Sequence, residues 1–194
     1  MEKKIKKSGC SYVHYSFAPE ILTADAELTL KRFETFSRQI RDEIKDFCLQ
    51  NDISECILIG VSLSCVTASL IASDNPLVTE LIMVVPGHSL AESMWNGLRT
   101  RTIREAMEKQ GLGLVDVQKK WERLAPEFCL QSLADKKMKI IISRTDQIIP
   151  AQYGKRYAEA AGKIIPSVAV IENRWFGHYA SILDYCYHLK VIEA

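Results

Sequence analysis

Three residues of the types used in nucleophilic catalysis, Ser62, Asp146 and His178, each follow a separate short apolar segment of the sequence. A serine hydroxyl is a poor nucleophile at neutral pH and needs a base to take its proton. A histidine serves as that base when a carboxylate holds its tautomer and stabilises its cation. The chain supplies the three side chains in the order serine, carboxylate, histidine. They therefore predict a nucleophilic Ser62 that is activated by His178 and Asp146.

The segment around Ser62 has the pattern of a sharp turn between a strand and a helix. Residues 56–59 are apolar and largely β-branched, which indicates a strand buried on both faces, and residues 65–73 indicate a packed helix. Such a turn lifts the serine oxygen off the sheet and aims the N–H of the next residue, Leu63, at the position of an oxyanion. Residues 60–64 read GVSLS, with serine in place of the second glycine of the G-x-S-x-G motif. Taken alone, this segment is equally well explained by a buried turn.

The elements that must position these residues alternate along the chain. The apolar pattern predicts a long helix between Asp25 and Asn51, and five short strands at residues 11–17, 56–59, 79–85, 139–143 and 167–171. Further helices are predicted at residues 65–73, 152–161 and 179–192. This alternation predicts an α/β fold with a doubly wound, mainly parallel, five-stranded sheet. The ligand site of such a sheet lies at the carboxyl ends of its strands, where Ser62, Asp146 and His178 all fall.

Residues 88–137 contain no predicted strand and form about fifty residues between two strands, far more than a usual crossover needs. They predict a helical cap insertion, with helices at residues 90–109, at 114–124 and in a short segment ending at 134. Most of its apolar residues serve helix packing. We predict that three residues contribute to substrate binding, namely His88, Met94 and Trp95. Three arginines of the insertion, Arg99, Arg101 and Arg104, favour a solvated face, and the alternative is that they bind a carboxylate or phosphate group, such as that of a carrier.

The composition favours a protein of one domain whose partner is neither nucleic acid nor membrane. The chain has 194 residues, with 25 basic and 24 acidic side chains and a net charge of +1. The lysines at positions 3, 4, 6 and 7 indicate a solvated terminus rather than a nucleic-acid arm. No apolar run approaches the ~20 residues of a membrane span, and no secretory signal pattern is present. We therefore expect a cytoplasmic protein.

The cysteines and histidines are scattered, so we expect no metal site. No G-x-G-x-x-G follows a strand and no Walker A sequence is present, so we expect no cofactor either. The six cysteines indicate small buried residues in a reducing compartment, and they are Cys10, Cys48, Cys56, Cys65, Cys129 and Cys186. A nucleophilic Cys65 or Cys129 is a minor alternative. Cys65 lies in the first turn of the helix after Ser62, where the helix dipole lowers a thiol pKa, but it points away from the apex of the turn.

Three segments carry a resemblance to the α/β-hydrolase family, in its lipase, esterase and thioesterase grouping. They read ILIGVSLS around Ser62, IIISRTDQIIP around Asp146 and RWFGHYASIL around His178. The resemblance covers about residues 20–194, and the insertion at 88–137 lies where that family carries its cap. It implies one α/β-hydrolase-like domain over residues 1–194, with Ser62 as nucleophile, His178 as general base and acid, Asp146 as orienting acid and Leu63 as an oxyanion donor.

The resemblance further implies a serine hydrolase that cleaves a small-molecule ester or thioester, free or carrier-bound, through an acyl-enzyme. Two alternatives stay open. An acyltransferase would use the same three residues. A non-catalytic, hydrolase-like binding protein or subunit would account for Ser64 and for the short N-terminal part.

The N-terminal part departs from the family pattern. The family normally has three or four strands before the serine turn, and this chain has room for one. We expect the strand at residues 11–17 to pair with the strand at 56–59, so that the N–H of Phe17 supplies the second oxyanion donor. The alternative is that another chain, in a homodimer or with a different partner, supplies the missing strands, because an apolar strand such as 56–59 is not expected to stay unpaired.

Overall fold

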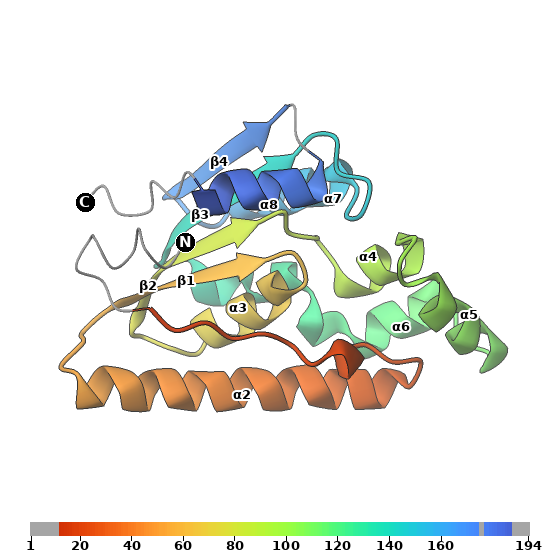
Figure 1. Cartoon of the computed structure of the whole chain (residues 1–194), viewed down its shortest axis with the longest axis horizontal. Coiled ribbons are helices and arrows are strands. Elements are labelled where there is room, and N and C mark those ends of the chain that lie inside the picture. Colours follow the sequence, from red (N-terminus) through yellow and green to blue (C-terminus); the bar gives the residue numbers. More distant parts are fainter. Residues whose placement is uncertain (1–11, 175–176, 188–194) are drawn as a thin grey trace.

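A parallel sheet with helices on both faces organises the computed structural model, which describes residues 12–174 and 177–187 (Figure 1). Its four strands lie in the order of the sequence, and each is parallel to the next. They are β1 (Cys56–Val61), β2 (Val78–Val84), β3 (Lys137–Ser143) and β4 (Val168–Asn173). The predicted α/β fold with a parallel sheet is confirmed, but the sheet of the described residues has four strands and not five.

Helices cover the two faces of the sheet unequally. On one face, α3 (Ser64–Ala72) and α7 (Ala151–Gly162) enclose the main core with β2 and β3. The long helix α2 (Ala26–Gln50) packs outside α3, away from the sheet (Figure 1). On the other face, α8 (His178–Tyr187) contacts β2 and β3 through a smaller apolar cluster. All four helices lie where the sequence predicts helices.

The cap insertion forms short helices that begin beyond the carboxyl end of β2; the first of them pack beside the N-terminal half of α2, and the last, η3, packs against α3 and α7 in the main core (Figure 1). They are α4 (Leu90–Asn96), α5 (Arg101–Lys109), α6 (Leu114–Lys120), η2 (Glu122–Leu124) and η3 (Pro126–Leu133). Trp121 fastens this group to the body, because its buried indole N–H donates to the carbonyl oxygen of Ala26 at 2.9 Å.

The prediction of one continuous helix over residues 90–109 is wrong. The chain leaves the helix at Gly97, and the hydroxyl of Thr100 donates to the carbonyl oxygens of Met94 and Gly97. A side chain that satisfies the last carbonyls of a helix offers the backbone an alternative to further helix. The short connection between α4 and α5 is therefore fixed by local hydrogen bonds. The predicted helix at 114–124 likewise ends at Lys120 and continues as the 3₁₀ turn η2.

The predicted strand at residues 11–17 is wrong for the residues that the structure describes, 12–17, which form no sheet pairing. This segment lies along α2 instead (Figure 1). The ring of Phe17 stands 5.6 Å from that of Phe33 and 5.1 Å from that of Phe36, between ring centroids. Partial burial, together with the hydrogen bond to Glu43, raises the pKa of Tyr15. The aromatic residues that suggested a strand therefore serve packing on a helix, and the short turn η1 (Pro19–Ile21) follows.

As a consequence, β1 is an edge strand of the described sheet. The N–H of Cys56 donates to the carbonyl oxygen of Leu77, just before β2, and the N–H of Ser62 donates to that of Val84 in β2. Because successive residues of a strand direct their N–H and C=O groups to opposite sides, those of Ile57, Ile59 and Val61 point away from β2. At Val61 the hydroxyl of Ser64 accepts from the N–H and donates to the C=O, both at 2.8 Å. Ser64 thus makes the two hydrogen bonds that a neighbouring strand would make at this position.

Several predictions concern residues that lie outside the described ones. These are the lysines at positions 3, 4, 6 and 7, Cys10, the side chain of Cys186 and residues 188–192 of the predicted last helix. Among the described helices, none combines the length and the apolar character that crossing a bilayer takes.

Candidate active site

Ser62 occupies the apex of a tight turn between β1 and α3. Its φ angle is +54°, in the left-handed region that a residue with a side chain adopts only under strain, and such strain gathers at functional sites. Its N–H donates to the carbonyl oxygen of Val84 at 2.8 Å, which fixes the turn to β2. A Cβ atom on Gly60 would lie 2.8 Å from the Cα of Cys65 and 2.9 Å from the Cβ of Ala68. The first glycine of the motif is therefore needed for the close approach of α3 to β1.

Asp146 lies in the turn that follows β3. Its Oδ1 accepts hydrogen bonds from the backbone N–H groups of Ile148 and Ile149, both at 2.9 Å. Its Oδ2 faces the imidazole of His178. Only 8% of the residue is exposed, so its two oxygens find their partners within the protein. The backbone donors hold the carboxylate in one orientation, with one oxygen left for the histidine.

His178 begins α8 and contacts both other residues. Its Nδ1 lies 2.6 Å from Oδ2 of Asp146, and its Nε2 lies 2.9 Å from Oγ of Ser62. With the proton on Nδ1, the ring donates to the carboxylate and accepts the serine hydroxyl proton at Nε2. The side chain is only 4% exposed, which shields both contacts from competing water. The structure thus brings together the three residues that the sequence predicts, from three separate elements of the fold.

Leu63 and Phe17 differ in how the structure places them. The N–H of Leu63 lies at the N-terminus of α3 and makes no hydrogen bond to any described residue. It is therefore available to a ligand at the Ser62 turn. The side chain of Phe17 packs on α2, and the strand that was expected to bring its N–H beside Ser62 is not formed. Its role as an oxyanion donor stays a prediction.

The three predicted substrate-binding residues lie in different surroundings. Met94 is 2% exposed and belongs to the core between the cap and α2, so it presents almost no surface to a ligand. Trp95 is half-buried and packs against the same core. Nε2 of His88 contacts a carboxylate oxygen of Glu127 of η3, and its buried Nδ1 has no partner among the described residues. None of the three hydrogen-bonds to Ser62, Asp146 or His178 in the described structure.

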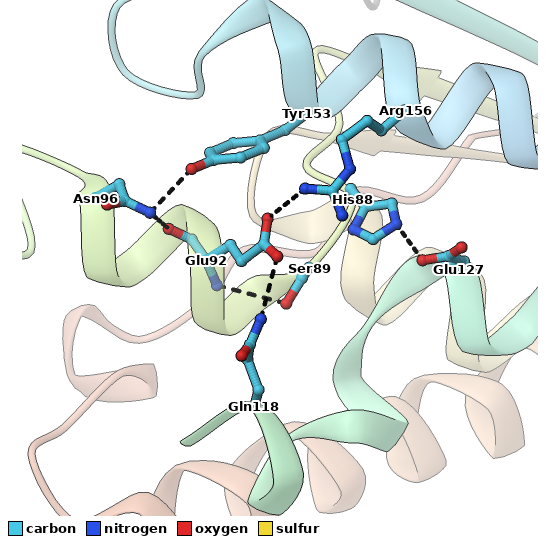
Figure 2. Close-up of polar contacts among 8 residues, drawn as sticks. All are labelled: His88, Ser89, Glu92, Asn96, Gln118, Glu127, Tyr153 and Arg156. Atoms are coloured by element: carbon cyan, nitrogen blue, oxygen red, sulfur yellow. Dashed lines mark hydrogen bonds and ion pairs between the residues drawn. The ribbon is translucent and has the colours of Figure 1, made fainter. Parts of the chain in front are cut away.

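His88 belongs to a polar cluster that joins the cap to α7 (Figure 2). Glu92 of α4 accepts from Gln118 at 3.1 Å and from Arg156 of α7 at 2.9 Å. Asn96 donates to the hydroxyl oxygen of Tyr153 at 2.9 Å. Because α7 follows the turn that holds Asp146, these contacts tie the cap to the part of the body that carries the carboxylate.

Burial is the main cause of a lowered pKa at His88. The charge of Glu127 opposes the shift, that of Arg156 adds to it, and that of Glu92 opposes it. The imidazole therefore resists protonation in the folded protein, even though a carboxylate lies beside it.

The alternative nucleophiles and ligands find little support within the described ranges. Burial raises the pKa of the Cys65 thiol, which donates to the carbonyl oxygen of Val84, and raises the pKa of Cys129 to about 11. Both thiols therefore stay protonated at neutral pH.

No three described side chains come together as a metal site requires. The cavity beside Asp146 holds about 10 Å³, enough for one water molecule but not for an acyl chain.

Tyr179 is a residue near the site that no sequence motif identifies. Its ring stands edge-on to that of His178, with centroids 5.4 Å apart and an interplanar angle of 89°. The guanidinium carbon of Arg99, from the connection between α4 and α5, lies 5.0 Å from the centroid of the Tyr179 ring. Tyr179 directly follows His178 in the sequence, and this adjacency is the signal that points to Tyr179.

Comparisons with known proteins agree with this arrangement at the level of the fold. No protein-family model matches the sequence, and no curated protein is significantly similar to it. Among solved structures, the chain is similar to an acylaminoacyl peptidase of Pyrococcus horikoshii, with a TM-score of 0.64 and 13% identity over 82% of this chain and 25% of that one. It is also similar to an esterase of Pyrococcus furiosus, with a TM-score of 0.57 and 14% identity over 79% of this chain and 56% of that one.

A third similar structure is an alpha/beta hydrolase enzyme from the metagenome of lagoon sediments of Mar Chica, Morocco. Its TM-score is 0.50, with 18% identity over 82% of this chain and 65% of that one. The chain thus spans less than two thirds of each of these proteins, in one case only a quarter. At identities this low, the likeness concerns the arrangement of strands and helices. The described chain has the α/β-hydrolase fold.

Proposed function

We propose that the protein is a serine hydrolase that cleaves carboxylic esters or thioesters through an acyl-enzyme on Ser62. The observation that supports this most strongly is the continuous array from Ser62 through His178 to Asp146, with contacts of 2.9 and 2.6 Å. Both contacts lie within the range in which a nucleophile, its base and the orienting group work together. The strained φ angle of Ser62 supports the same role.

The proposed reaction has two halves. In the first, Oγ of Ser62 attacks the acyl carbonyl carbon while Nε2 of His178 takes the hydroxyl proton, and Asp146 stabilises the imidazolium. The N–H of Leu63 donates to the oxyanion of the tetrahedral intermediate. The carbon–oxygen or carbon–sulfur bond then breaks, and His178 protonates the leaving alcohol or thiol. In the second half, water attacks the acyl-enzyme, His178 takes its proton, and the acid leaves as Ser62 regains its hydroxyl proton.

The test of the proposal is covalent labelling with a fluorophosphonate probe, followed by hydrolysis of 4-nitrophenyl butyrate and of a butyryl thioester. We expect wild-type protein to be labelled and active, and Ser62→Ala to lose both properties. Ser54→Ala, an exposed serine outside the site, is the matched control and should behave as wild type. A folded wild type that the probe does not label would overturn the proposal in favour of a binding protein. Labelling with acyl transfer to an added alcohol, but no release of acid, would instead identify an acyltransferase.

The second oxyanion donor has its own test. We keep the N–H of Phe17 as the candidate, because in the family that the sequence resembles the second donor comes from a loop after a strand that precedes the serine turn, and in this sequence that loop corresponds to residues 16–18. Phe17→Pro removes this N–H, whereas Phe17→Ala removes the ring and keeps the N–H. Loss of one oxyanion donor costs about 10²–10³ in kcat, so we expect Phe17→Pro to be slower than Phe17→Ala by that factor. Equal rates would assign the donor to another group.

The proposal also covers the substrate, the compartment and the partner of the protein. The substrate is a small-molecule acyl ester or thioester, free or bound to a carrier, and the protein works in the cytoplasm. A homodimer or a partner chain that pairs with the outer edge of β1 remains part of the proposal. The exposed apolar side chain of Ile57 on this edge strand supports it.

A further inference from the structure

The three arginines at the start of the cap differ in their partners. Nε of Arg101 lies 2.6 Å from a carboxylate oxygen of Glu105. Arg104 donates to the carbonyl oxygen of Trp95 at 2.8 Å and lies 3.9 Å from Glu108. Arg99 forms no ion pair with a carboxylate of the described residues, and its guanidinium lies over the ring of Tyr179. Two of the three arginines are therefore used within the cap, and one is directed elsewhere.

The acidic residues of the neighbouring cap helices do not neutralise Arg99. Glu92, the one carboxylate of α4, is bound by Arg156 of α7 at 2.9 Å. The two carboxylates of α5, Glu105 and Glu108, lie beside Arg101 and Arg104. The charge of Arg99 thus remains uncompensated by the two helices that flank it.

The position of Arg99 connects this charge to the candidate active site. Its guanidinium carbon stands 5.0 Å from the centroid of the Tyr179 ring, and that ring stands 5.4 Å from the ring of His178. A single aromatic ring therefore separates the cation from the imidazole. Stacking on a ring orients a guanidinium without using its N–H donors, which stay available to a ligand. Their planar arrangement matches a carboxylate or phosphate group.

We infer that Arg99 is a specificity-determining residue that binds an anionic group of the substrate, so that the preferred ester or thioester carries a carboxylate or phosphate close to its scissile bond. This inference rests on the proposed function. Tyr179 acts as a positioning residue, because it holds the guanidinium at a fixed distance from His178. The anion lies on the acyl part or on the leaving group, and the substrate pairs below distinguish these two sources.

The experiment compares charged and neutral esters of the same size. The acyl-side pair is 4-nitrophenyl hemiglutarate and 4-nitrophenyl valerate, and the leaving-group pair is 4-carboxyphenyl butyrate and 4-carbamoylphenyl butyrate. We expect Arg99→Gln to lower kcat/KM for the charged member of at least one pair by roughly 5- to 50-fold, the loss of one charge-assisted contact at an exposed site. The neutral esters should change less than about two-fold, because they make no such contact. Arg99→Lys should restore part of the loss.

The matched control is Arg101→Gln, an arginine of the same cap that already has a carboxylate partner. We expect it to leave all four rates unchanged. High salt should reduce the preference of the wild type for the charged ester, because it screens an exposed ion pair. If Arg99→Gln affects charged and neutral esters alike, or neither, the inference is overturned while Ser62-dependent hydrolysis stands. If the wild type is neither labelled by the fluorophosphonate nor active on any of the four esters, the proposed function fails and this inference fails with it.

Discussion

Two histidine–carboxylate pairs lie beyond the carboxyl ends of the strands in the described structure, and they differ in what the second ring nitrogen meets. Nδ1 of His178 faces Asp146, and its Nε2 faces the hydroxyl of Ser62 at 2.9 Å. Nε2 of His88 faces Glu127, and its buried Nδ1 has no partner among the described residues. The pair at His178 therefore continues to Ser62, the proposed nucleophile, whereas the pair at His88 ends within the cap. A histidine beside a carboxylate is a candidate base only when a third group can give it a proton.

The two carboxylates, Asp146 and Glu127, differ in how firmly the protein holds them and in how exposed they are. Asp146 sits in a tight turn whose two backbone N–H groups fix its orientation, and it is 8% exposed. Glu127 belongs to the 3₁₀ segment η3, and 43% of its side chain is exposed. The first carboxylate is held rigidly toward one ring nitrogen. The second pairs with His88 inside the cap, close to the contacts of Glu92 with Arg156 and of Asn96 with Tyr153 that join the cap to α7 (Figure 2).

Replacing each histidine by asparagine gives the largest contrast. We expect His178→Asn to lower kcat/KM for 4-nitrophenyl butyrate by roughly 10⁴–10⁶, because the base that activates the serine is lost. His88→Asn should stay within a few-fold of wild type, because His88 does not touch the reacting groups. Steady-state kinetics of the two purified variants measures this, with circular dichroism to show that both are folded. Comparable losses in the two variants would contradict the distinction.

The two carboxylates give the next contrast. Asp146→Asn keeps the shape of the side chain but no longer favours the proton on Nδ1 of His178, so kcat should fall by roughly 10³–10⁴. Glu127→Gln should leave kcat within a few-fold, because its partner His88 makes no contact with Ser62. Initial rates at saturating ester, followed over a range of pH, distinguish the two. An Asp146→Asn variant as active as wild type would remove Asp146 from the proposed mechanism.

Much of the sheet was predictable from the sequence, because its four strands read as short apolar runs. The central strands β2 and β3 are buried as expected, whereas the edge strands β1 and β4 are more exposed, so the prediction that residues 56–59 are buried on both faces is wrong. The segment at residues 12–17 has the same kind of composition and forms no strand. The ring of Phe17 packs on Phe33 and Phe36 of α2 instead, and such packing suits an aromatic residue as a sheet does. Strand formation depends on an available edge, and composition does not report it. At Val61, the last residue of β1, the hydroxyl of Ser64 already hydrogen-bonds to both the N–H and the C=O that a neighbouring strand would need.

The candidate site was predictable in its residue types and order, but not in its contacts. The positions of Ser62, Asp146 and His178 just past strand ends placed them at one edge of a parallel sheet. Position alone could not separate His178 from His88, which also follows a strand. Only the path of the cap, which brings Glu127 to His88 and Arg99 to Tyr179, shows which groups these residues meet. Such contacts join residues far apart in the sequence, so no local pattern encodes them.

The cluster around His88 should contribute to stability rather than to catalysis. Glu92→Ala removes the carboxylate that accepts hydrogen bonds from Gln118 and from Arg156, so both donors lose their partner. We expect the free energy of unfolding to fall by about 1–3 kcal/mol. The control is Glu105→Ala, which breaks an exposed pair with Arg101 and should not measurably change that free energy. Urea unfolding monitored by tryptophan fluorescence tests both. Equal effects in the two variants would show that the cluster does not hold the cap.

The smallest expected effect is a pH dependence of stability that comes from His88. Burial lowers its pKa below the ordinary value of 6.5, and the opposing charges of Glu127 and Glu92 do not reverse the shift, while Arg156 adds to it. Because the folded state binds this proton less readily than the unfolded state, His88 contributes stability that is present above pH 6.5 and is lost as the pH falls through the lowered pKa. We therefore expect the free energy of unfolding to fall between pH 8 and pH 5 more steeply in wild type than in His88→Asn. A variant that instead loses more stability than wild type on acidification would mean that the ion pair with Glu127, and not burial, sets the protonation of His88.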